Sequence, residues 1–88
     1  MADMYWQIEV NPITHRELYV NVGGKVESPV MATVPRILSH LKKLVPSDRV
    51  ISGYFFSENF DLSEETNENL RQKVRTAIRT FNHANESS

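Results

Sequence analysis

The chain has 88 residues, with 10 Lys and Arg against 11 Asp and Glu, a formal net charge of −1 and 40% apolar residues. A chain of this length buries roughly 60 to 70% of its unfolded surface, so we expect one marginally stable domain that would gain from self-association. The absence of cysteine excludes disulfides, thiolate metal sites and cysteine nucleophiles. Three glycines cannot form either common glycine-rich phosphate loop, and the near-neutral charge gives no general argument for nucleic acid.

The first part of the chain predicts three strands. Apolar residues alternate with polar ones over residues 4–10 and again over 18–22, the period-two pattern of strands with one buried face. Gly23-Gly24 predicts a two-residue hairpin turn into a third strand over residues 26–30. Pro29 has no N–H donor, so we expect this strand at a sheet edge or near its own end.

The period then changes to that of a helix. Apolar residues from Val34 to Val45 lie on one helical face, with Thr33 as a possible N-cap and Pro46 as the stop. Residues 49–56 are β-branched and aromatic on both sides, which predicts a more central strand.

A second helix is predicted after residues 59–62. Asp61 or Ser63 can cap it, and glutamates favour its positive dipole end. The tail from Asn82 is expected to fray. The predicted core face comprises Leu70, Val74, Ala77, Ile78 and Phe81.

This order of elements predicts an α+β two-layer sandwich. The expected topology is β-β-β-α-β-α, with a mainly antiparallel sheet and two helices on one face. We expect a single domain over residues 1–84 and a disordered polar tail over 85–88.

The sheet face opposite the helices is the leading candidate surface, because no further element remains to cover it. An exposed aromatic patch of this kind is typical of an interaction site, although Tyr5 and Tyr19 could equally form an ordinary cross-strand pair. Base stacking is a third possibility. Either Tyr54 with Phe56 or Phe55 with Ile51 must also face this side. The predicted protein-binding residues are Tyr5, Gln7, Tyr19, Asn21 and Tyr54.

A second candidate surface is basic, and would contact the phosphates of nucleic acid. It requires the basic flanks of the two helices to be adjacent, whereas a solvated helix face explains the same charges. The residues are Arg36, Lys42, Lys43, Arg71, Arg75 and Arg79.

The sequence offers few catalytic groups. His15, His40 and His83 lack metal-ligand spacing, and we expect His40 to be solvated. No metal and no cofactor are therefore expected. An enzyme would need an interfacial site in an oligomer, where His15 or His83 meets carboxylates of a second chain.

These patterns favour a small non-catalytic binding or regulatory protein. It would act through protein–protein contact, as a homodimer or docked on another protein, using the open sheet face or an edge strand. The alternative is a nucleic-acid-binding module. The first residues do not resemble a secretion signal, and no apolar stretch approaches the ~20 residues of a membrane span, so we expect a cytoplasmic protein with no membrane partner and no small-molecule substrate.

Overall fold

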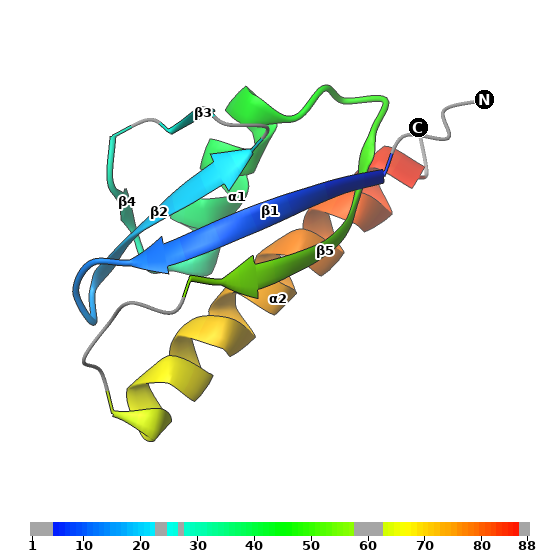
Figure 1. Cartoon of the computed structure of the whole chain (residues 1–88). Helices are drawn as coiled ribbons and strands as arrows, with labels where there is room; N and C mark the ends of the chain where they lie inside the picture. Colours follow the sequence, from blue (N-terminus) through cyan, green and yellow to red (C-terminus); the bar gives the residue numbers. More distant parts are fainter. Residues whose placement is uncertain (1–4, 23–24, 27, 58–62, 87–88) are drawn as a thin grey trace.

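A computed structural model describes residues 5–22, 25–26, 28–57 and 63–86. Both helices pack on one face of a single sheet, and no helix of the described residues lies on the other face (Figure 1). The small α+β domain predicted from the sequence is therefore confirmed. Its elements are β1 (Tyr5–Pro12), β2 (Glu17–Val22), β3 (Lys25–Val26), β4 (Val30–Met31), α1 (Val34–Leu44), β5 (Val50–Phe56) and α2 (Glu64–Glu86).

The sheet is mixed, so the expectation of a mainly antiparallel sheet is only partly right. The strand order is β3-β2-β1-β5, with β4 also beside β2. The pairings of β2 with β1, β3 and β4 are antiparallel, whereas β1 and β5 are parallel. Parallel pairing requires a crossover over one face of the sheet, and α1 lies within the connection from β4 to β5.

The predicted third strand is broken into two short ones along the same side of β2. β3 pairs with Asn21 and Val22, and β4 pairs with Glu17 and Leu18. Pro29 directly precedes β4. This position fits proline, because a residue without an N–H donor cannot bond to neighbours on both sides within a sheet. Val22 lies opposite Lys25, which fits the predicted two-residue connection, although the turn at residues 23–24 lies outside the described part of the chain.

The core lies between the sheet and the two helices, and the predicted strand and helix faces supply it. Burial of such side chains is the main favourable term in folding. Residues exposed by 8% or less include Ile8, Val10, Leu18, Val20, Val22, Ile37, Leu41, Ile51, Leu70, Val74, Ala77, Ile78 and Phe81.

Both predicted helix starts are confirmed. The Thr33 hydroxyl accepts a hydrogen bond from the Arg36 backbone N–H at 3.4 Å, and the Ser63 hydroxyl accepts one from the Thr66 N–H at 3.2 Å. The prediction for His40 is wrong: this side chain is only 7% exposed, because it lies on the flank of α1 beside β4 rather than on the outer face of the helix.

Neither described helix combines the length and the apolar composition that a membrane span needs.

The prediction that residues 49–56 form a more central strand is wrong, because β5 ends the strand order. Its N-terminal half is bonded by side chains of α2. The Asn82 side chain accepts a hydrogen bond from the Ile51 N–H and donates one to the Ile51 carbonyl, both at 2.7 Å. Asn85 donates to the Arg49 carbonyl at 2.8 Å. The tail predicted to fray from Asn82 is accordingly helical to Glu86, and residues 87–88 lie outside the described part.

Asn82→Ala should lower the free energy of unfolding by about 1–3 kcal/mol, because the substitution removes two partly buried hydrogen bonds to the backbone of β5. Urea denaturation measures the change. Asn69→Ala, at an exposed position of the same helix, is the matched control and should change stability little. Equal stability of the two variants would contradict the role of Asn82.

Candidate functional site

The uncovered sheet face is formed by alternate residues of β1, β2 and β5. Their neighbours in sequence, such as Ile8 and Val20, are buried under the helices, so these residues point the other way. The register places Phe55, Glu9 and Asn21 in one row across the three strands, with Asn11 and Tyr19 in the next row. We call the set Gln7, Glu9, Asn11, Tyr19, Asn21 and Phe55 the open face.

A register shift in β5 decides which aromatic rings reach the open face. Trp6 pairs with Ile51, but the next residue of β1, Gln7, pairs with Gly53, so the register skips Ser52. Such a bulge reverses the alternation of side chains. Ile51 is therefore on the helix side together with Tyr54 and Phe56, which pack against the core. Phe55 points outward and is 52% exposed.

The structure places four of the five predicted protein-binding side chains. Gln7 is exposed, and Tyr19 and Asn21 are half-buried, all on the open face. Tyr54 is not: its hydroxyl donates a hydrogen bond to the Arg71 carbonyl of α2 at 3.4 Å, so it belongs to the helix side. Tyr5 lies in β1, but its side chain is outside the described part. Phe55 is the residue that the sequence analysis left undecided.

Asn21 is half-buried as a residue, but its side-chain oxygen is fully buried. Its Oδ1 atom is out of contact with solvent and receives no hydrogen bond from the described residues. A buried acceptor without a partner costs on the order of 1–3 kcal/mol. Asn21 is therefore a place where a donor from outside the described residues would stabilise the protein.

The open face carries a carboxylate, but the described residues give it no basic side chain. Glu9 lies at its centre, between Phe55 and Asn21, and none of the described strand residues on this side is Lys or Arg. Nucleobases stacked on Phe55 or Tyr19 would bring phosphates to this surface, where no described Lys or Arg could bind them. Proteins that bind single strands combine aromatic stacking with a positively charged groove. The described strand residues of the open face thus offer no cation to a phosphate.

The two sheet edges are less available than the open face. On one side β3 and β4 are two residues each and are separated at Pro29. On the other side Asn82 hydrogen-bonds the backbone of Ile51 in β5, and Asn85 hydrogen-bonds the carbonyl of Arg49 just before this strand. Short strands, proline and coverage are the usual means of preventing strand addition at an edge.

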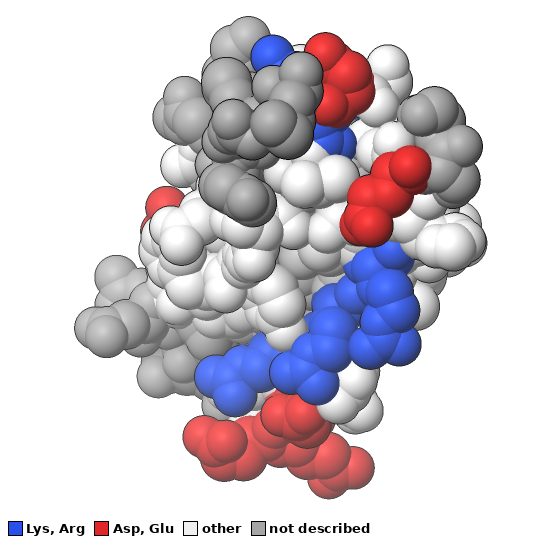
Figure 2. Space-filling model, turned by 90° about the vertical axis from the view of Figure 1, so that its right-hand side faces the viewer, with Lys and Arg blue, Asp and Glu red and all other residues white. Residues whose placement is uncertain are grey.

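The predicted basic residues do not form one surface. Arg71, Arg75 and Arg79 follow one flank of α2, and Figure 2 shows a diagonal row of basic side chains next to a group of acids. Arg75 and Arg79 line a hollow of about 450 Å³ beside β5. Arg36 and Lys43 line a different hollow of about 400 Å³ beside β4, at the opposite edge of the sheet. Lys42 is exposed elsewhere on α1.

No constellation of catalytic or metal-binding groups is apparent in the part of the chain that the structure describes. No three His, Asp or Glu side chains in that part gather closely enough to hold a metal ion. His15 lies in the β1–β2 turn, His40 on α1 and His83 on α2.

Arg71 differs from the other arginines of its row, because its guanidinium carbon lies 5.4 Å from the centre of the Phe56 ring. Arg71→Ala should lower the free energy of unfolding by roughly 0.5–1 kcal/mol through lost cation–π contact and packing. Arg79→Ala, at an exposed position two turns later, should have no measurable effect in the same thermal and urea titrations. An equal loss in both variants would mean that the row acts through charge alone.

Comparison of the chain with models of known protein families, with curated proteins and with solved structures finds no match. The function of the protein is therefore inferred from its own surfaces.

Proposed function

We propose that this protein is a non-catalytic binding protein that associates through its open face, with a second copy of itself as the partner. The observation that carries the proposal is Phe55, which is 52% exposed on the edge strand β5, at one border of a sheet face that neither helix covers. Tyr19 adds an amphipathic ring to the same surface. Aromatic residues are enriched at the centres of protein interfaces, where their burial contributes most of the binding energy.

The size of the open face limits the affinity. Three strands at ~4.8 Å spacing, each with about six residues rising ~3.3 Å, outline roughly 300 Å². Stable interfaces bury about 800 Å² per partner. The expected association is therefore weak, with a Kd on the order of micromolar, and suits a regulatory contact better than a permanent dimer.

Nucleic-acid binding is the second candidate, and one observation supports it. Arg75 and Arg79 are exposed on one flank of α2, and within the described residues neither forms an ion pair. This surface would involve α2 without α1, because the basic residues of α1 lie toward the other sheet edge.

Phe55→Glu and Tyr19→Glu should each weaken self-association about tenfold or more, because a charge would be buried where a ring was. Sedimentation velocity over a range of concentrations measures the association, and circular dichroism verifies that the variants are folded. Thr80→Glu, which adds the same charge at an exposed position of α2, is the control and should dimerise normally.

A monomer at every concentration would contradict self-association. A dimer that both open-face substitutions leave intact would contradict the choice of surface. Loss of dimer in Thr80→Glu alone would transfer the interface to α2.

Glu9 supplies a test by charge. A face-to-face dimer brings two copies of Glu9 together, and like charges in an interface oppose association. Glu9→Gln should therefore tighten the dimer, and added salt should tighten the unmodified dimer by screening. The same sedimentation series at low and high salt gives both results. Association that weakens with salt would instead require opposite charges across the interface, as in docking on a basic partner.

A further inference from the structure

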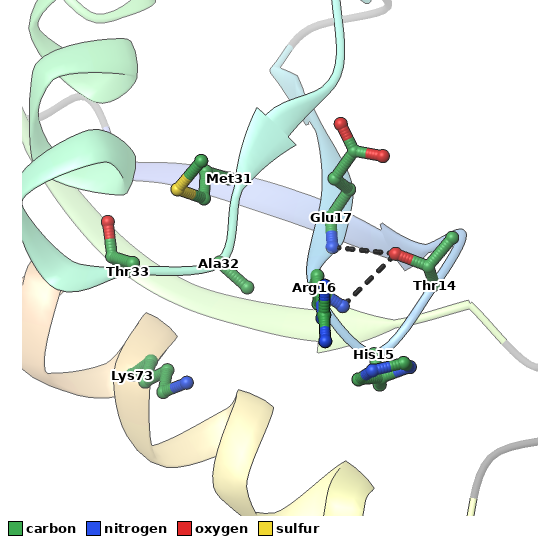
Figure 3. Close-up of a pocket in the computed structure, with 8 residues that line it drawn as sticks. All are labelled: Thr14, His15, Arg16, Glu17, Met31, Ala32, Thr33 and Lys73. Carbon is green, nitrogen blue, oxygen red and sulfur yellow. Dashed lines mark hydrogen bonds between the residues drawn. The ribbon is translucent and has the colours of Figure 1, made fainter.

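A hollow of about 590 Å³ lies where the β1–β2 turn approaches the start of α1 and the middle of α2 (Figure 3). Its wall combines groups from three parts of the chain: His15 and Arg16 from the turn, Met31 and Thr33 from the segment around β4, and Lys73 from α2. The volume is in the range of small-molecule sites, which is about 300–1,000 Å³.

Three cationic or N–H-donating side chains meet at this hollow without an acidic partner. Lys73 reaches from α2 toward Arg16 and His15, while the carboxylate of Glu17 points away from them (Figure 3). All three are exposed, and within the described residues none of their side chains forms an ion pair or a hydrogen bond. The repulsion between the Arg16 and Lys73 charges is therefore not offset by the described residues, and an anion would offset it.

The turn that carries two of these groups is held by local hydrogen bonds. The Thr14 hydroxyl accepts hydrogen bonds from the backbone N–H groups of Arg16 and Glu17, at 3.0 and 2.9 Å. The Ile13 and Thr14 N–H groups both donate to the Glu17 carbonyl. His15 and Arg16 are thus presented from a defined backbone, which reduces the entropy lost when a ligand binds.

The remaining wall points to the second half of the ligand. Met31 is 55% exposed and contributes a flexible apolar side chain to the hollow. A small inorganic anion would leave this surface in water. A ligand with both an anionic group and an apolar body would use the whole hollow.

We propose that the hollow binds a small organic phosphate monoester, with the phosphate on Arg16, Lys73 and His15 and the apolar body against Met31. A phosphate monoester carries a charge between −1.5 and −2 at neutral pH and three acceptor oxygens. It therefore matches two fixed cations and an imidazole N–H better than a single carboxylate does. The site uses residues outside the open face and is independent of the proposed function.

Phenyl phosphate is the probe, titrated into the full ¹⁵N-labelled chain and followed by two-dimensional NMR. The expected result is saturable shifts of the amides of residues 14–17 and 31–33 and of Lys73. The double variant Arg16→Gln/Lys73→Gln should weaken binding about tenfold or more, since two charge-assisted contacts are lost. Arg75→Gln/Arg79→Gln, which removes the same charge from another flank of α2, should bind as the unmodified protein does.

Two further titrations separate the parts of the ligand. Inorganic phosphate should bind at the same residues but more weakly, and phenol should not bind there. Absence of saturable shifts with phenyl phosphate, equal weakening in the two double variants, or equal binding of phenol would each overturn the proposal. The spectra of both double variants also report directly that they are folded.

Discussion

The parallel pairing of β5 with β1, and the register shift within it, is the constraint on which the rest of the structure depends. The shift at Ser52 lets Ile51, Tyr54 and Phe56 all face the helices although they do not share one alternation. Without the shift, one side of the strand could not bury both Ile51 and the two rings. The same shift leaves Phe55 as the one aromatic residue of β5 on the other side. A single irregularity therefore completes the core and places an exposed aromatic ring at the β5 side of the open face.

The second consequence concerns the edges of the sheet. Because β5 is at the end of the sheet, one side of its backbone has no neighbouring strand. Asn82 of α2 partly covers this side, since its side-chain amide hydrogen-bonds both the N–H and the carbonyl of Ile51. The opposite edge is divided at Pro29. Because both edges are restricted in this way, we propose the open face as the surface for contact with another protein, and its central Glu9 and small area predict that such contact is weak.

Much of this fold could be predicted from the sequence, because period-two and helical patterns depend on local alternation that the core preserves. The Thr33 and Ser63 caps and the buried faces of both helices are examples. The position of β5 could not be predicted, because a bulged edge strand with apolar residues on both sides resembles a central strand. Arg16 and Lys73 could not be predicted as neighbours, because 56 residues lie between them in the sequence and only the packing of α2 brings them together. Tyr54 was named as a protein-binding residue although the sequence left its face open, and the register shift turns it toward the helices.

The register shift divides the aromatic residues of β5 between the two faces of the sheet, and fluorine NMR tests this division most directly. With 4-fluorophenylalanine incorporated and the signals assigned by substitution, a soluble paramagnetic probe is added to a dilute sample. We predict strong broadening for Phe55, less for Phe56 and little for Phe81, which is 2% exposed. A Phe55 signal that resists the probe while Phe56 broadens would contradict this division, because β5 would then present the opposite face.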